Sequence, residues 1–99
     1  MARFDVYRVT GEGPLFLDCQ ANTFDYLSTR FVVPLLRVGG VVQPTRRLHP
    51  VFMIDGTDYI MATQLATAVP VRVLGKVIVS LEQEDGRIRD ALDMLMCGF

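Results

Sequence analysis

Few side chains in this sequence have the type and spacing that enzyme chemistry requires. The single histidine, His49, lies between Leu48 and Pro50. Imidazole is the commonest general base in enzymes, but a histidine beside a proline at a loop edge is more often structural, and we expect that role here. The sequence contains no P-loop, no Cys-x-x-Cys pair and no nucleophile elbow. We therefore predict neither a catalytic centre, nor a metal site, nor a bound cofactor.

Two arginines and two cysteines could also bind a ligand. Arg46 and Arg47 could contact a phosphate group, but a lone basic pair in an acidic protein is more often a solvated strand edge. The chain has ten basic and eleven acidic residues, a formal charge of −1 and a pI near 5.7, so no general basic field is available for holding nucleic acid. Cys19 and Cys97 lie far apart without metal-ligand spacing, which favours reduced thiols in a cytoplasmic protein over a disulfide.

The last residues of the chain carry the most informative pattern. Met94, Met96 and Cys97 lie off the main apolar face of a C-terminal helix, so both faces of its last turn are apolar. Asp90 and Asp93 stand in the last turns, where the helix dipole disfavours negative charge. Two interpretations remain open. This end is buried in a core or a homodimer, or it is an apolar docking tip, ringed by acid, that suits a partner with arginines.

These groups must be positioned by a chain that is mostly β-strand. Residues 22–29 have no clear period and are expected to form a loop. Asp55-Gly56 predicts a tight turn, and Pro34 predicts an edge strand or a bulge, because proline cannot donate to a ladder. Residues 77–79 extend the preceding strand or pair back as a hairpin. The other strands are predicted at residues 4–9, 15–20, 31–36, 51–54, 59–62 and 69–74.

The C-terminal segment changes to a helical period. Ser80 and Gln83 fit a capping box, and Gly86 is expected to weaken the first turn by about 1 kcal/mol. The predicted fold is mainly β, a small barrel or strongly bent antiparallel sheet closed by one C-terminal helix. One face of that helix is formed by apolar residues spaced by four, three and four positions: Ile88, Leu92, Leu95 and Phe99.

Length and composition favour a single domain over residues 1–99. Apolar residues make up 51% of the chain, and the mean hydropathy is +0.32. Because a domain of this size buries only roughly 60–70% of its unfolded surface, the apolar surplus favours an oligomer. We expect homodimer contacts from the region of Met61 and from the helix face Ile88–Leu92–Leu95. No apolar run approaches the about 20 residues of a membrane span, and the alternating N-terminus does not resemble a signal peptide.

Short motifs follow one another in a specific order along nearly the whole chain. Each is weak alone, and their order and spacing make the combination specific. They are Phe4-Asp-Val-Tyr7, Leu15-Phe-Leu-Asp-Cys-Gln20, Val32-Val-Pro-Leu35, Arg46-Arg-Leu-His-Pro-Val51, Met61-Ala-Thr63, Val69-Pro-Val-Arg-Val-Leu-Gly75, and the helix from Ile88 that leads to Gly98-Phe99. In these motifs the chain resembles the CcdB-type toxins, the gyrase-poisoning proteins of type II toxin–antitoxin modules.

The resemblance implies an SH3-like barrel with an antiparallel five-stranded sheet, a small second sheet and a C-terminal helix. It implies a cytoplasmic homodimer without enzymatic activity, whose helices lie near the twofold axis. The target would be the A subunit of DNA gyrase, a type II topoisomerase, trapped in its cleavage complex by the helix tip. An antitoxin would neutralise the toxin through a disordered C-terminal segment. The two proteins would repress their own operon, with the antitoxin contacting the DNA.

The family's gyrase contacts correspond to two groups of residues in this sequence. At position 97 the family has a tryptophan whose ring stacks on an arginine of gyrase, a contact that a thiol cannot make, and the chain has no tryptophan. Gly98 matches the family pattern, and Phe99 keeps a hydrophobic end. The helix tip supplies Asp93, Met96, Cys97, Gly98 and Phe99, and the loop after the second strand supplies Thr23 and Phe24.

The substitution at Cys97 leaves two alternatives to a gyrase poison. The first is an inactive relative that keeps dimerisation, antitoxin binding and operon repression. The second is an endoribonuclease like the MazF-type toxins, which share the barrel and cut RNA in a basic groove. The balanced charge and the lack of a convincing acid–base pair argue against a ribonuclease.

Overall fold

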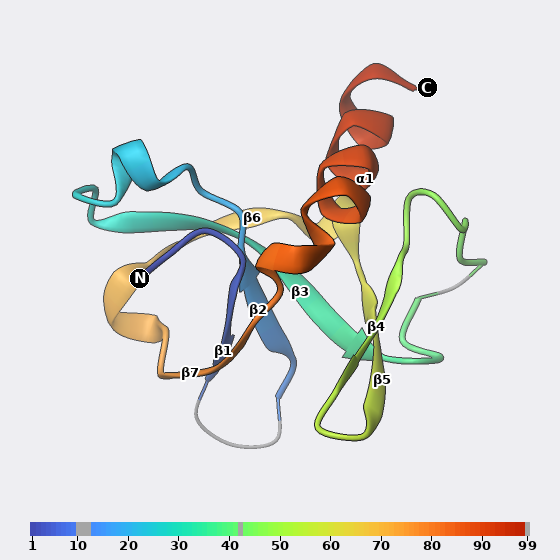
Figure 1. Cartoon of the computed structure of the whole chain (residues 1–99), viewed down its shortest axis with the longest axis horizontal. Helices are drawn as coiled ribbons and strands as arrows, with labels where there is room; N and C mark the ends of the chain where they lie inside the picture. The colour runs from blue at the N-terminus through green and yellow to red at the C-terminus, as the bar shows by residue number, and fades with distance from the viewer. Residues whose placement is uncertain (10–12, 42, 99) are drawn as a thin grey trace.

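The chain folds into a bent, barrel-like antiparallel sheet with one helix across its end (Figure 1). This computed structural model describes residues 1–9, 13–41 and 43–98. The helix α1 spans Asp85–Cys97, and the 3₁₀ turns η1 to η4 span Asn22–Phe24, Thr63–Leu65, Val71–Val73 and Glu82–Glu84. The strands in the described part of the chain are β1 (Asp5–Arg8), β2 (Leu15–Asp18), β3 (Thr29–Arg37), β4 (Val51–Ile54), β5 (Thr57–Met61), β6 (Thr67–Pro70) and β7 (Lys76–Ser80).

Hydrogen bonding joins the described strands into one antiparallel sheet. The strand order is β4-β5-β3-β2-β1-β7, and β6 pairs with the first half of β3. The predicted class, mainly β with one C-terminal helix in an SH3-like barrel, is confirmed. The small extra strand β6 stays attached to the main sheet, because β3 is long enough to pair with β6 at one end and with β5 at the other.

The strand β3 runs through the centre of the sheet, so the prediction that Pro34 marks an edge strand or a bulge is wrong. Along one side, β3 pairs continuously with β2, and Pro34 lies opposite Phe16. Along the other side, residues 29–32 pair with β6 and residues 35–37 with β5. Pro34 lies between these two partners, and its carbonyl accepts a 2.9 Å hydrogen bond from the amide of Ala62. Proline is accommodated because no described strand pairs on the side where its N–H would point.

The turn predicted at Asp55-Gly56 is confirmed. The two residues have φ angles of 51° and 78°, so β4 and β5 are joined by the kind of two-residue turn that favours Asp-Gly. The turn sets the alternation of β4. Phe52 and Ile54 face the interior, whereas Met53 points outward and is 71% exposed.

The strand predicted over residues 69–74 ends early. Its pairing with β3 stops at Pro70, and the amide of Val71 then donates to the carbonyl of Ser28 at 3.0 Å as the chain turns through η3. The question left open for residues 77–79 is decided by β7, which pairs antiparallel with β1. The sequence could not show this because β1 lies at the other end of the chain.

The C-terminal helix begins later than the capping pattern predicts. The Ser80 hydroxyl accepts a 3.2 Å hydrogen bond from the amide of Glu82, but this contact starts the 3₁₀ turn η4. The helix α1 follows from Asp85, with Glu84 as an N-cap residue that lacks a side-chain cap. The predicted capping box is therefore wrong. The helical period itself is correct, because the burial of Ile88 fixes the face that α1 turns to the core.

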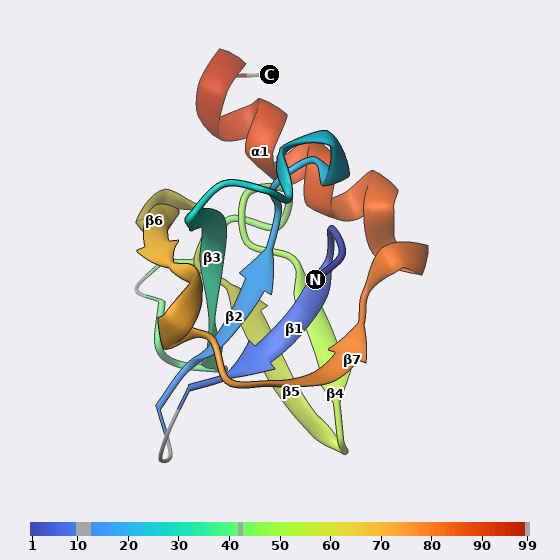
Figure 2. The same ribbon diagram turned by 90° about the vertical axis from the view of Figure 1, so that its left-hand side faces the viewer.

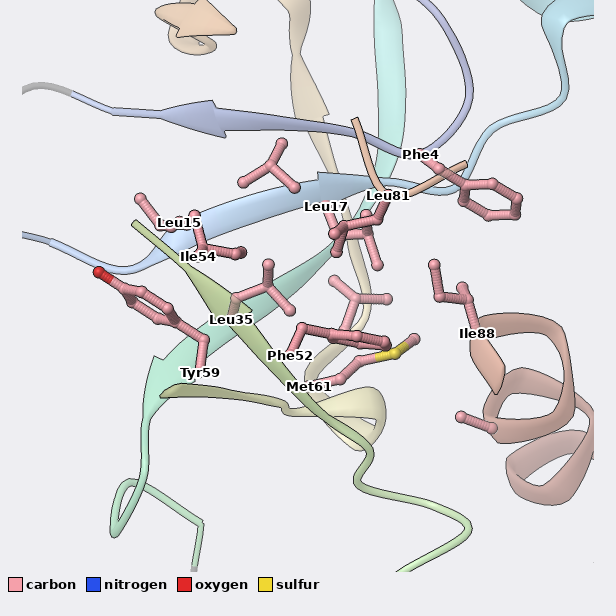
Figure 3. Close-up of a cluster of buried hydrophobic side chains, with 13 residues drawn as sticks. Phe4, Leu15, Leu17, Leu35, Phe52, Ile54, Tyr59, Met61, Leu81 and Ile88 are labelled. Atoms are coloured by element: carbon pink, nitrogen blue, oxygen red, sulfur yellow. The ribbon is translucent and has the colours of Figure 1, made fainter. Parts of the chain in front are cut away.

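The helix α1 closes one end of the barrel by burying part of its apolar face. Ile88 and Ala91 are fully buried and belong to a core cluster that includes Phe52 and Met61 from the strands (Figure 3). Met61 and Ile88 lie inside the chain's own core, so neither side chain is available for the predicted homodimer interface, which stays a prediction for the region of Met61 and the outer part of the helix face. Leu95, further along the same face, is 45% exposed.

A smaller apolar cluster occupies the opposite face of the sheet. It is formed by Tyr7, Val32 and Leu74, with Phe16 and Val69 packed against it. The connection through η3 covers this face, since Leu74 follows that turn. No helix among the described residues is long and apolar enough to cross a membrane.

Candidate functional site

The predicted helix-tip residues lie on the part of α1 that extends beyond the barrel (Figures 1 and 2). Met96 is 80% exposed, and Asp93, Cys97 and Gly98 are exposed as well. Phe99 lies outside the described residues, and its role stays a prediction. Side chains this exposed do not belong to the chain's own core, so the described part of the tip is free to contact another molecule.

Gly98 ends the helix for a conformational reason. Its φ of 81° is in the left-handed region, and its amide donates a 2.8 Å hydrogen bond to the carbonyl of Met94. A Cβ at Gly98 would meet no atom within 4 Å, so space is not what requires glycine. The left-handed conformation costs other L-residues about 1–2 kcal/mol. The backbone conformation that ends α1 at Gly98 therefore favours glycine.

The ring of acid expected around the tip is only partly present. The Arg47 guanidinium donates two hydrogen bonds to the Asp90 carboxylate, from Nε to Oδ2 at 3.1 Å and from Nη2 to Oδ1 at 2.8 Å. These bonds hold the pKa of Asp90 below its usual range. Arg47 is exposed to solvent, as the sequence indicates, but it lies in the connection between β3 and β4 and not on a strand edge, and its hydrogen bonds link this connection to α1. Asp93 remains exposed on the tip.

His49 has the structural role that the sequence predicts. Its Nδ1 accepts a 2.9 Å hydrogen bond from the amide of Thr45, and its Nε2 lies 2.8 Å from Oε1 of Gln64. Because Nδ1 accepts from a backbone N–H, the proton of the neutral ring is on Nε2. Both ring nitrogens are used within the fold. Among the described residues, no three histidine, cysteine, aspartate or glutamate side chains gather as a metal site.

The two cysteines are free and lie in different environments. Cys97 is exposed at the helix tip, whereas Cys19 is half-buried against the main core. Burial raises the pKa of the Cys19 thiol to about 12, and the neighbouring Asp18 carboxylate adds to the shift. No disulfide joins the two residues in the structure. Little of the Cys19 thiol ionises near neutral pH, so Cys97 is the accessible sulfur.

The other predicted residues, Thr23 and Phe24, lie on the turn η1, and both are exposed. Polar side chains hold this turn in place. Gln20 donates from Nε2 to the Phe24 carbonyl at 2.7 Å and accepts at Oε1 from the Phe31 amide at 2.8 Å. Asn22 Oδ1 accepts from the amide of Arg3 at 2.8 Å. The turn is therefore fixed to both β3 and the N-terminal segment.

Sequence reasoning missed the apolar side chains that extend the η1 surface. Tyr26 is 75% exposed, and its ring centroid lies 6.5 Å from that of Phe24. Leu27 and Phe31 are also exposed. The available signal was the run of large apolar residues inside a segment without strand or helix period, since a solvated loop rarely needs them.

A buried ion pair lies beneath η1. Arg30 and Asp18 are both fully buried, and Asp18 Oδ2 is 2.9 Å from Nε and 2.6 Å from Nη2 of Arg30. The second carboxylate oxygen accepts from the amide of Gln20 at 3.0 Å. Loss of one partner of such a pair leaves a buried charge and costs about 3–5 kcal/mol. The pair therefore fixes the point where the chain leaves β2 for η1.

The two predicted groups of residues do not meet within one chain. Figure 1 shows η1 and the tip of α1 on different sides of the same end of the molecule, and Figure 2 shows η1 in front of the helix. The described structure thus presents two separate exposed apolar surfaces. One is the α1 tip, defined by Asp93, Met96, Cys97 and Gly98, and the other is the η1 surface, defined by Thr23, Phe24, Tyr26 and Leu27.

A groove lies between the β3–β4 connection, β4 and α1. It consists of adjoining cavities of about 410 and 340 Å³ that share Arg46, Pro50 and Arg87. Arg87 is held in place, because its Nη2 donates to the Val51 carbonyl at 2.8 Å and its guanidinium lies 4.7 Å from the ring centroid of Phe52. The rest of the lining is mixed, with apolar Val38, Pro44, Val51 and Ile60 beside polar or charged Thr45, His49, Arg47 and Asp90.

Comparisons with known proteins agree with this architecture. The family described as "CcdB protein" matches residues 3–98 of the chain. A solved structure described as an endoribonuclease in complex with its cognate antitoxin, from mycobacterial species, has a similar fold with a TM-score of 0.76. The similarity covers 97% of this chain and 94% of the other, at 19% sequence identity. At that identity, the likeness establishes the fold and leaves the activity open.

Proposed function

The chain belongs to the CcdB family, and from this premise we propose that it is the toxin of a type II toxin–antitoxin module that inhibits DNA gyrase by binding its A subunit. The observation that carries the proposal is the family match over residues 3–98, which includes both η1 and the α1 tip. The proposed mode of action is binding, with no reaction catalysed by the chain. The A subunit would be held in its cleavage complex.

The shape of α1 supports a role in binding gyrase. The helix is anchored by Ile88 and Ala91 and extends beyond the barrel, where Leu95 and Met96 are exposed. An apolar tip on a rigid support loses little conformational entropy when it binds. Cys97 has less apolar area than the family's tryptophan, so we expect a weaker complex, with Met96 and Phe99 as the remaining large side chains.

Binding to purified gyrase A subunit and inhibition of supercoiling test this proposal. The chain should be retained by the A subunit, and its expression should arrest growth in a manner that gyrase mutants escape. Cys97→Trp should strengthen binding by about tenfold, because it restores the aromatic anchor. Met53→Trp is the matched control, since Met53 is also exposed but lies on β4, away from the tip. If neither the wild type nor Cys97→Trp binds, the target is wrong.

We also propose that a cognate antitoxin neutralises the chain through a disordered segment that lies in the groove beside α1. The groove combines apolar lining residues with the guanidiniums of Arg46 and Arg87, and so suits a segment with acidic and apolar side chains. Arg46→Glu should weaken the complex with the antitoxin encoded beside the gene, and Arg72→Glu, on η3, should not. Antitoxin binding without gyrase binding would identify the inactive relative. With its antitoxin, we expect the chain to repress its operon.

A homodimer remains part of the proposal. Exposed apolar side chains that could be covered by a second copy include Phe31, Leu65 and Leu95. Light scattering at micromolar concentration should give twice the mass of the chain, and a monomeric mass would contradict this expectation. A ribonuclease is not favoured, because His49, the one histidine of the chain, uses both ring nitrogens within the fold.

A further inference from the structure

A cavity of about 280 Å³ opens at the end of the barrel opposite α1. It is lined by the last residues of β1 and β3, by Tyr59 of β5, and by Gly13 and Pro14 before β2. Figure 3 shows Tyr59 and Ile88 at opposite ends of the core, with the Tyr59 hydroxyl directed away from the cluster. The helix therefore closes one end of the barrel interior, and this cavity occupies the other.

The strand register brings three cations to this end. Arg8 lies directly opposite Lys76 of β7, and Arg37 lies directly opposite Tyr59. Because side chains alternate along a strand, Arg37 is on the same face of β3 as the core residue Leu35. Gly75 allows the close approach of β7, since a Cβ there would collide with the carbonyl of Arg8. Arg8 and Arg37 both line the cavity.

The register places like charges beside one another at this end of the barrel. Like charges directly opposite each other on neighbouring strands destabilise a sheet, and within the described residues no ion pair joins Arg8, Arg37 or Lys76 to a carboxylate. The chain as a whole carries a formal charge of −1, so the local excess of positive charge does not follow from composition. An anion bound between the arginines would offset the repulsion.

We propose that this cavity binds a phosphate group, with Arg8, Arg37 and the Tyr59 hydroxyl as donors. Guanidinium groups match the geometry of phosphate with pairs of hydrogen bonds, and the phenol can supply a further donor. Leu35, Leu36 and Pro14 also line the cavity and could contact the less polar part of a phosphorylated molecule such as a nucleotide. The site lies away from both the α1 tip and η1, and does not depend on the proposed gyrase activity.

Titration of the ¹⁵N-labelled chain with inorganic phosphate, against chloride at equal ionic strength, tests the site. The Nε–Hε signals of Arg8 and Arg37 should shift and saturate. Arg8→Gln should weaken binding by about tenfold. Tyr59→Phe should weaken phosphate binding less than Arg8→Gln does, because it removes one donor and keeps the ring in the core. The matched control Arg72→Gln removes the same charge from an exposed arginine on η3 and should leave phosphate affinity unchanged.

A stability measurement provides a second test. Arg8→Gln should raise the unfolding temperature in the absence of phosphate, because it removes the repulsion with Lys76, and Arg72→Gln should not. Phosphate should raise the unfolding temperature of the wild type more than that of Arg8→Gln. Lack of saturation, or equal weakening by Arg8→Gln and Arg72→Gln, would overturn the proposal.

The phosphate could belong to a small molecule or to a nucleic-acid backbone, and the dependence of affinity on ligand length distinguishes the two. A 5′-mononucleotide that binds as tightly as a single-stranded oligothymidylate would identify a small phosphorylated ligand. Affinity that rises with chain length, and falls with salt, would identify a nucleic-acid backbone. Either result supports the site, provided that Arg8→Gln weakens binding of that ligand.

Discussion

The two ends of the barrel differ in shape and charge although the same strands run between them. At one end, α1 buries Ile88 and extends an exposed apolar tip with Met96. At the other end the interior opens into a small cavity lined by Arg8 and Arg37. The first end is convex and suits a protein surface, whereas the second is concave and suits a small anion. The difference arises because α1 covers the first end, whereas no α-helix among the described residues covers the second.

The comparison also shows how much the tip depends on its anchor. The apolar face of α1 changes from fully buried at Ile88 and Ala91 to 45% exposed at Leu95. A helix of this length is only marginally stable in water by itself. The tip is therefore rigid only while the first turns remain packed on the strands, and the opposite cavity should not depend on α1 in this way. Four substitutions test this division, in order of decreasing effect.

Ile88→Ala should have the largest effect. Truncation of a fully buried isoleucine leaves a cavity and lowers the free energy of unfolding by about 2–5 kcal/mol. Urea denaturation followed by circular dichroism measures the loss. Leu95→Ala is the control on the same helix face and should cost much less, since Leu95 is already half-exposed. Equal losses for the two variants would mean that α1 is not anchored as described.

Met96→Asp should act on binding and leave folding unchanged. A charge in place of an 80% exposed methionine removes apolar contact with a protein partner, and we expect affinity for the gyrase A subunit to fall by at least about tenfold. Surface plasmon resonance measures the change. Met53→Asp, at an exposed methionine on β4, should bind like the wild type. If both variants lose affinity equally, the tip is not the binding surface.

Gly98→Ala should loosen the end of the helix. The left-handed φ of 81° becomes strained by about 1–2 kcal/mol when a Cβ is present. The amide proton of residue 98, which donates to the Met94 carbonyl, should then exchange faster with solvent. Amide hydrogen exchange measures this rate. Exchange at Ile88 should be unchanged, and a uniform increase along α1 would instead indicate global destabilisation.

Arg47→Gln should have the smallest effect, and it should depend on pH. The hydrogen bonds from Arg47 hold the pKa of Asp90 below its usual range, so the ionised pair stabilises the fold above the ordinary carboxyl pKa. This contribution is lost as the pH falls through the lowered pKa. The unfolding midpoint of Arg47→Gln should lie below that of the wild type at neutral pH and approach it in acid. The exposed position and salt screening keep the difference small.

A matched substitution checks that the change in unfolding midpoint comes from loss of the Arg47–Asp90 hydrogen bonds and not from removal of a positive charge alone. Arg89→Gln removes the same charge from α1, where Arg89 lies 3.7 Å from Asp85 in a weaker contact. It should change the unfolding midpoint less than Arg47→Gln does. A reversed order would show that the bond between the β3–β4 connection and α1 does not stabilise the fold.

The elements that the sequence predicted well depend on short-range information. Asp55-Gly56 favours a tight turn through its own backbone preferences, and the alternation of Phe52 and Ile54 follows from that turn. The helical spacing after Ile88 likewise lies within a few residues. The apolar helix tip also followed from local spacing, whereas the η1 residues came only from resemblance to a family, since no local pattern points to Thr23 or Phe24.

The elements that it missed depend on partners far away in the chain. Pro34 is tolerated in a central strand because β6 and β5 meet β3 on either side of it. The role of Asp90 depends on Arg47, and Met61 is buried because the strands and α1 surround it. None of these partners is visible from the residues themselves, so their effects could not be predicted from pattern.

The sequence by itself determined a mainly β chain with one C-terminal helix and an apolar end, because alternation, turn residues and helical spacing are local properties. Only the tertiary structure decided which charged side chains pair with an opposite charge and which lie beside a like charge. The register of β1 with β7 brings Arg8 beside Lys76, while the packing of α1 brings Asp90 to Arg47. Charges interact through space, so their partners are fixed only when the strands and the helix take their final positions.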